Sequence, residues 1–209
     1  MAILEHWVKN VYIGEYEFKT KYQEVEYIQS SWTQWLNTWF TPNSNTKVQV
    51  KFALITNSWY MDVGYLSGTD LNDRRLFMAY GTNKWTVDVP WWSGSGNRLS
   101  WWVWSTGTTE EIEFWNFYIK SMADGTTYTA TAVTFTWIST IKLCRNELQS
   151  LTNSDRFYYV KIFDGGTLVR DLKPCYRKSD NVIWMYDLVN NQFYTNSWTW
   201  TFTKWPDVN

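Results

Sequence analysis

Residues 46–55 read TKVQVKFALI, and this stretch decides the expected fold. Apolar and polar side chains alternate along it. The apolar set is Val48, Val50, Phe52 and Leu54, and the polar set is Lys47, Gln49 and Lys51. Successive side chains of a β-strand point to opposite faces, so the pattern predicts a strand with one buried and one solvent-facing side.

The same alternation, rich in threonine, valine and aromatic residues, recurs in four later segments. These segments are 110–119 (EEIEFWNFYI), 126–136 (TTYTATAVTFT), 156–163 (RFYYVKIF) and 180–188 (DNVIWMYDL). In 156–163 the pattern places Tyr158, Val160 and Ile162 on one side of the strand. Each segment is predicted to be a half-buried antiparallel strand, and one short helical turn is expected near residues 145–153.

Turn-forming residues separate the predicted strands. The turns are PNSN at 42–45, GTN at 81–83, SGSGN at 93–97, ADGT at 123–126, DGGT at 164–167 and VNNQ at 189–192. Asp164, Gly165 and Gly166 stand between two apolar runs, which is typical of a β-hairpin. The expected fold is therefore all-β: an antiparallel two-sheet jelly-roll sandwich of the concanavalin A-like kind.

A boundary is predicted near residue 21. Residues 10–22, NVYIGEYEFKTKY, alternate like a hairpin or lone strand but are too few to form a core. We expect residues 1–21 to be a short N-terminal β appendage and residues 22–209 to be the sandwich. Tyr12, Tyr16 and Phe18 would give the appendage enough apolar surface to dock on a partner's sheet edge.

Composition excludes several functional classes. The chain has 209 residues, with 19 Lys and Arg against 20 Asp and Glu, so no basic field attracts nucleic acid. No segment has the length and apolarity of a signal peptide or membrane span, and we expect synthesis in the cytosol without membrane insertion. The two cysteines, Cys144 and Cys175, are too few for a disulfide framework and are expected to be buried.

We expect no enzymatic activity. His6 is the only histidine, so histidine-dependent nucleophilic catalysis would have to recruit it from the N-terminal tail. Glu111 and Glu113 share one side of a predicted strand, as glycosidase carboxylates do, but no third acidic residue completes such a site. Charges alternating along a strand are more typical of a solvated face.

Two binding hypotheses remain. Asp70, Asn72 and Asp73 in GTDLNDRR could bind Ca²⁺ through their side-chain oxygens, or could form an ordinary turn. No other cofactor is expected. A crowded set of indoles could stack on sugar rings, or could be core or interface residues. This set is Trp91, Trp92, Trp101, Trp102 and Trp104.

Tryptophan is unusually abundant, with 17 residues, and glycine is scarce, with 10. Several indoles stand in small, polar contexts where a turn favours glycine. They are Trp32, Trp39, Trp198, Trp200 and Trp205. A codon that one genetic code translates as tryptophan and another as glycine would give this composition, and this third interpretation competes with sugar stacking and with core packing.

Two blocks resemble a known family. Residues 24–41, EVEYIQSSWTQWLNTWFT, and 172–205, LKPCYRKSDNVIWMYDLVNNQFYTNSWTWTFTKW, are similar to laminin-G-like, concanavalin A-like jelly-roll domains of phage and prophage virion proteins from gut bacteria. The likeness covers about residues 22–209. The family has glycine where this chain has tryptophan at six positions: Trp32, Trp39, Trp184, Trp198, Trp200 and Trp205.

The resemblance implies a virion component rather than an enzyme. It implies assembly in the host cytoplasm, contacts with other virion proteins through the N-terminal segment, and a homo-oligomer, commonly a trimer. A tail, baseplate or head fibre protein that contacts a host-surface glycan is the expected function. The alternatives are a bacterial cell-surface carbohydrate-binding module and a capsid-decorating domain without a ligand.

Overall fold

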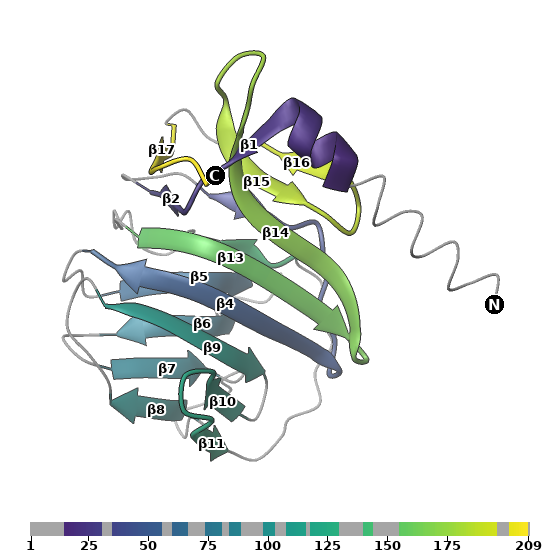
Figure 1. Ribbon diagram of the computed structural model, residues 1–209. Helices are drawn as coiled ribbons and strands as arrows, with labels where there is room; N and C mark the ends of the chain where they lie inside the picture. The colour runs from purple at the N-terminus through teal and green to yellow at the C-terminus, as the bar shows by residue number, and fades with distance from the viewer. Residues whose placement is uncertain are drawn as a thin grey trace.

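The computed structural model describes an antiparallel β protein with one short helix (Figure 1). The described residues are 15–30, 35–55, 60–66, 74–80, 84–88, 98–102, 108–115, 118–129, 140–143, 155–195 and 201–208. All strand pairings among them are antiparallel. The predicted all-β, antiparallel class is therefore confirmed.

The larger sheet has 11 strands, and its main path runs β11-β10-β9-β4-β13-β14-β15-β16. The strands on this path are β4 (Thr46–Leu54), β9 (Thr109–Trp115), β10 (Tyr118–Ser121), β11 (Thr127–Thr129), β13 (Asp155–Asp164), β14 (Thr167–Arg177), β15 (Ile183–Asp187) and β16 (Gln192–Tyr194). Three short strands attach at the side: β1 (Tyr22–Glu24), β2 (Ile28–Gln29) and β17 (Thr203–Lys204).

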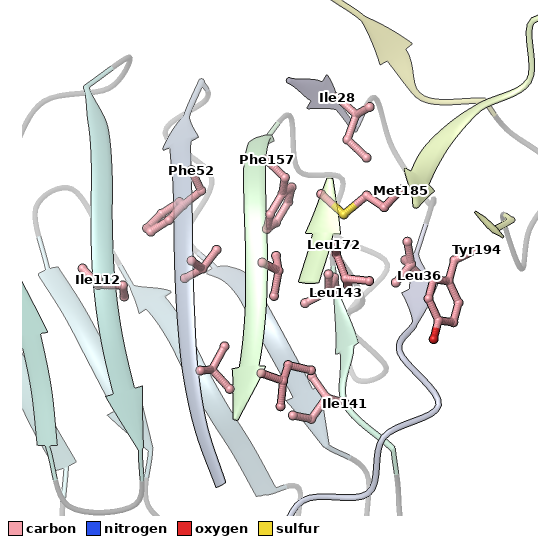
Figure 2. Close-up of a cluster of buried hydrophobic side chains, with 14 of the residues drawn as sticks. Ile28, Leu36, Phe52, Ile112, Ile141, Leu143, Phe157, Leu172, Met185 and Tyr194 are labelled. Carbon is pink, nitrogen blue, oxygen red and sulfur yellow. The ribbon is translucent and has the colours of Figure 1, made fainter. Parts of the chain in front are cut away.

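The second sheet has six strands in the order β3-β12-β5-β6-β7-β8. They are β3 (Leu36–Asn37), β5 (Tyr60–Leu66), β6 (Arg74–Tyr80), β7 (Lys84–Asp88), β8 (Arg98–Trp102) and β12 (Lys142–Leu143). In the view of Figure 1, β5 to β8 are drawn behind β13, β4 and β9. Leu36 and Leu143 of this sheet lie in the same hydrophobic core as Val50 and Val160 of the larger one (Figure 2).

The inner faces of β4 and β13 form the centre of this core. Val48, Val50 and Phe52 are at most 1% exposed, as the alternation in residues 46–55 predicts. Val160 and Ile162 are fully buried opposite Val50 and Val48. Burial of aliphatic and aromatic side chains is the dominant stabilising contribution in folding, so these two adjacent strands anchor the fold.

The prediction for Tyr158 is wrong because β13 contains a β-bulge. The register with β4 shifts between Phe157 and Tyr159, so Phe157 faces the core and Tyr158 does not share the side of Val160. An inserted residue changes the side on which all preceding residues of a strand lie. Tyr158 instead contacts the ring of Tyr27 at a centroid distance of 5.2 Å.

The predicted hairpin at residues 164–167 is confirmed. It joins β13 to β14, and Gly165 and Gly166 have φ angles of 54° and 84°. Positive φ at both central residues gives the turn the twist of the flanking strands, and glycine adopts it without a Cβ clash. Asn191, in the predicted turn before β16, also has a positive φ of 54°.

Residues 110–119 form two strands rather than the single predicted strand. β9 ends at Trp115, and β10 begins at Tyr118 and folds back against it, with Ile119 opposite Phe114. Both of these residues are buried, so apolar periodicity continues across the reversal and hides it in the sequence.

The expected N-terminal β appendage is wrong for residues 15–21, which form a helix. Lys21 and Glu17 pair on successive turns, and Phe18 is the one buried residue of the segment. In a strand, Phe18 would share its side with Tyr16, whereas in the helix Phe18 is 5% exposed and Tyr16 is 73% exposed. The helix therefore separates two aromatic side chains that a strand would place on one side.

Candidate binding face

The outer face of the larger sheet carries two rows of polar side chains across β9, β4 and β13. The first row is Glu113, Gln49 and Lys161, and the second is Glu111, Lys51 and Tyr159. All six side chains are half-buried, on the side of β4 opposite Val48 and Val50. We call these six residues the outer-face grid.

Tyr159 and Glu111 are joined across β4. The Tyr159 hydroxyl donates a hydrogen bond to Glu111 Oε1 at 2.5 Å, passing over the row position of Lys51. Burial, and then this hydrogen bond, raise the pKa of Tyr159 far above its usual value, so the phenol remains a neutral donor. Hydrogen bonds to an ionised acceptor are stronger than neutral ones, so the two side chains hold each other against the sheet.

Glu113 accepts from three side chains. Gln49 Nε2 lies 2.6 Å and the Tyr118 hydroxyl 2.9 Å from its carboxylate oxygens, and Lys47 Nζ lies 3.3 Å away. Burial opposes ionisation of Glu113, but these partners outweigh it and hold its pKa below the usual value. Glu113 is therefore an ionised, fixed acceptor at neutral pH.

Aromatic rings hold the lysines of this face. Lys51 Nζ lies 5.5 Å from the ring centroid of Tyr158, and Lys161 Nζ lies 5.6 Å from that of Tyr159. Attraction between an ammonium and an aromatic face contributes about 0.5–1 kcal/mol at such sites. The charged side chains thus lie on the outer side of the sheet, as alternation predicts, and there they are half-buried and paired.

Asp171 extends the first row on β14, opposite Lys161. Its Oδ1 atom is buried and has no hydrogen-bond partner among the described residues. Burial raises the pKa of Asp171, and the nearby Lys161 and Lys173 offset only part of that effect. An unsatisfied buried acceptor costs stability, so Asp171 is expected to destabilise the folded protein.

An aromatic cluster adjoins the grid at the β2 end. The Trp205 indole, 54% exposed, stacks on Tyr27 with the planes 10° apart and the centroids 5.9 Å apart. The Arg156 guanidinium lies 4.5 Å from the Tyr27 centroid, and Arg156 Nε donates to Gln29 Oε1 at 3.0 Å. Stacked guanidinium and aromatic planes give this end an ordered surface.

Asp187 organises the turn before β16. The carboxylate is fully buried and accepts from the backbone N–H groups of Asp171 and Val189, each at 3.0 Å. Asn190 Nδ2 and the Tyr194 hydroxyl also donate to it, at 2.6 and 3.3 Å. These contacts satisfy the buried charge, and burial next to Asp187 raises the pKa of Tyr194 to about 12.

Trp39 is held in a backbone conformation that favours glycine. Its φ is 52° and its side chain is 66% exposed. The Trp39 N–H donates to Asn37 Oδ1 at 2.9 Å, and Arg170 donates to the carbonyls of Thr38 and Trp39 at 2.9 and 3.4 Å. A left-handed backbone conformation costs an L-residue about 1–2 kcal/mol, and the surrounding hydrogen bonds hold Trp39 in it.

Three of the six tryptophans that stand where the resembled family has glycine lie in the described residues, and their surroundings differ. Trp39 fits the glycine-substitution hypothesis. Trp184 does not, because its indole is 2% exposed and meets the Phe202 ring edge-on at 4.7 Å. Trp205 has the stacking contact with Tyr27 described above. Trp32, Trp198 and Trp200 lie outside the described residues.

Most of the predicted ligand residues cannot be placed on this face. Trp91, Trp92 and Trp104, and the candidate calcium ligands Asp70, Asn72 and Asp73, lie outside the described residues. Trp101 and Trp102 belong to β8, where the backbone alone is described. The predicted helical turn at 145–153 and Cys144 are also outside the described part, whereas Cys175 is buried as expected.

The predicted anchor residues have different surroundings. Tyr12 lies outside the described residues, and Tyr16 is on the surface. Phe18 packs against the chain's own Tyr22 and Tyr186, with ring centroids 6.1 and 5.2 Å away. Among the described residues, Tyr16 is therefore the anchor candidate available to another protein.

Comparison with known proteins gives no relative. No family model matches the sequence, and neither a curated protein nor a solved structure is significantly similar to it. Within the described ranges, no three His, Cys, Asp or Glu side chains group as metal ligands. No helix in the same ranges is long and apolar enough to cross a membrane.

The outer-face grid was only partly visible in the sequence. The polar positions of β4 and β9 follow from alternation, but their pairing requires the register between strands. Alternation placed Tyr159 on the outer side correctly, but it placed Tyr158 on the inner side, because the bulge between Phe157 and Tyr159 leaves no signature in RFYYVKIF. Glycine often marks a bulge, and this segment has none.

Proposed function

We propose that this chain is a phage virion structural protein, a component of the tail, baseplate or head fibres, that presents a lectin-like domain to the host surface. Its antiparallel strands and buried core suit a concanavalin A-like jelly roll with two facing sheets. The two sequence blocks at residues 24–41 and 172–205 support membership of such virion domains. The protein would assemble in the host cytoplasm as a homo-oligomer, with a trimer as the expected form.

The observation that carries a binding role is the outer-face grid. Half-buried, mutually hydrogen-bonded side chains such as Tyr159, Glu111 and Gln49 are ordered before any ligand arrives. Recognition by ordered groups avoids the entropy cost of fixing side chains on binding. Such a face suits contact with a surface glycan better than catalysis, and we propose no enzymatic activity.

Two alternatives lead to different observations. A bacterial cell-surface carbohydrate-binding module would bind glycans without entering particles. A capsid-decorating domain would enter particles without binding glycans. Calcium dependence, if Asp70, Asn72 and Asp73 hold Ca²⁺, would appear as loss of glycan binding in a chelator.

The test is incorporation into phage particles. We expect a chain lacking residues 1–21 to be absent from purified particles, because the N-terminal segment is the proposed anchor. Tyr16→Ser is the milder variant: the side chain is 73% exposed, so the change should leave the fold intact and still reduce incorporation. Normal incorporation of both variants would reject the anchor, and absence of the wild-type chain from particles would reject the virion role.

A further inference from the structure

The outer-face grid is balanced in charge. It contains two lysines, Lys51 and Lys161, and two glutamates, Glu111 and Glu113, beside the neutral Gln49 and Tyr159. A polyanion or polycation is attracted by a field of one sign, which this face lacks. Charge complementarity therefore favours an uncharged partner.

The grid also offers hydrogen-bonding groups at regular spacing. Neighbouring strands lie about 4.8 Å apart, so adjacent side chains in a row repeat on the scale of one sugar ring. Amide, hydroxyl, carboxylate and ammonium groups alternate across the rows, and sugar hydroxyls both donate and accept. An apolar surface would leave these half-buried polar groups unpaired.

The grid is ordered in the plane of the sheet. Tyr159 reaches across β4 to Glu111, and Gln49 is fixed by its 2.6 Å hydrogen bond to Glu113. Aromatic contacts hold Lys51 and Lys161 beside the rings of Tyr158 and Tyr159. Side chains that point freely into water would need to be ordered by the ligand, whereas these do not.

We propose that the outer-face grid binds a neutral glycan. Glu111 accepts hydrogen bonds from the hydroxyl groups of the glycan, Gln49 donates hydrogen bonds to them, and Tyr159 fixes Glu111. This inference rests on the proposed function and names its ligand class and its site. It does not use the tryptophans of residues 91–104, which belong to a different part of the chain.

The test is affinity electrophoresis of the full chain in gels containing one soluble polysaccharide each. Dextran, laminarin and mannan are the neutral probes, and alginate is the acidic one. We expect the protein to be retarded by at least one neutral polysaccharide and not by alginate. Retardation by alginate, or by none of the neutral probes, would overturn the proposal.

Site variants locate the binding. Glu111→Gln and Tyr159→Phe each remove one charge-assisted hydrogen bond, and we expect about tenfold weaker binding, which corresponds to about 1.4 kcal/mol. Glu17→Gln, on the helix, and Tyr128→Phe, on β11, are the same substitutions away from the grid and should bind like wild type. Melting temperatures of all four variants identify any loss of fold.

The outcomes separate this inference from the virion role. Wild-type binding that is unchanged in Glu111→Gln and Tyr159→Phe would move the site elsewhere and leave the proposed function intact. A protein that enters particles but binds no neutral glycan would reject the glycan site alone. A protein that binds glycan but never enters particles would reject the virion role alone.

Discussion

The guanidinium of Arg170 lies 3.6 Å from the buried carboxylate of Asp187 and also donates to the Thr38 carbonyl at 2.9 Å. Arg170 belongs to β14, Asp187 ends β15, and Thr38 follows β3 of the second sheet. Arg170 therefore joins the turn before β16, through the ion pair, to a segment far away in the sequence, through the hydrogen bond to Thr38. Asp187 has no exposed surface, so nothing in water can replace its partners.

Asp187→Ala should be among the most destabilising substitutions in the described part of the chain. It leaves the N–H groups of Asp171 and Val189 without their acceptor and removes the counter-charge of Arg170. Breaking a buried ion pair costs about 3–5 kcal/mol, to be measured by urea denaturation. Asp180→Ala breaks the exposed Arg177–Asp180 pair, which water and salt screen, and should cost far less. Equal costs for the two variants would contradict the role given to Asp187.

The bulge in β13 leads to a second prediction. Phe157→Ala should destabilise the protein by about 3–5 kcal/mol, because the side chain is 1% exposed in the core. Tyr158→Ala should cost clearly less, because Tyr158 is half-buried outside the core. If Tyr158→Ala lowered the free energy of unfolding in urea more than Phe157→Ala does, simple alternation would hold and the bulge would be rejected.

Trp39→Gly is predicted to stabilise the protein. Glycine adopts a φ of 52° without a Cβ clash, so relief of about 1 kcal/mol is expected as a higher melting temperature. Trp184→Gly is the matched control and should destabilise by several kcal/mol, since it empties a core position. A lower melting temperature for Trp39→Gly would show that the indole contributes more than its backbone strain costs.

The intact mass of the protein purified from its natural source tests the recoding hypothesis directly. A mass that matches all 17 tryptophans rejects it, and a lower mass in steps of one tryptophan-to-glycine exchange supports it. Peptide sequencing across residue 39 then shows whether the strained position carries glycine. The core position of Trp184 indicates that an exchange need not extend to every tryptophan.

Alternation was informative where one face of a strand is buried along its whole length. Val48, Val50 and Phe52 could be placed in the core from sequence because β4 lies in the middle of the sheet. The bulge at Tyr158 and the reversal after Trp115 could not, since both depend on pairing with neighbouring strands rather than on local composition. The contact between Tyr159 and Glu111 in the candidate site could not be predicted from the sequence either, because it depends on the register of three strands.

Asp171 gives the last prediction, which concerns pH. Burial raises its pKa in the folded protein above the unfolded value of 3.8, so folding is favoured while the group is protonated. That contribution is complete below the unfolded pKa of 3.8 and is lost as the pH rises through the folded pKa. Asp171→Asn mimics the protonated form, so it should raise the melting temperature at pH 7 and have little effect at pH 3.

Asp180 gives the opposite sign and serves as the control for this measurement. The Arg177 hydrogen bond holds the pKa of Asp180 below its usual value, so Asp180→Asn should be neutral or slightly destabilising at pH 7. Melting curves of both variants and the wild type at pH 3 and pH 7 separate the two cases. If Asp171→Asn melted below wild type at pH 7, Lys161 and Lys173 would stabilise the carboxylate more than its burial destabilises it.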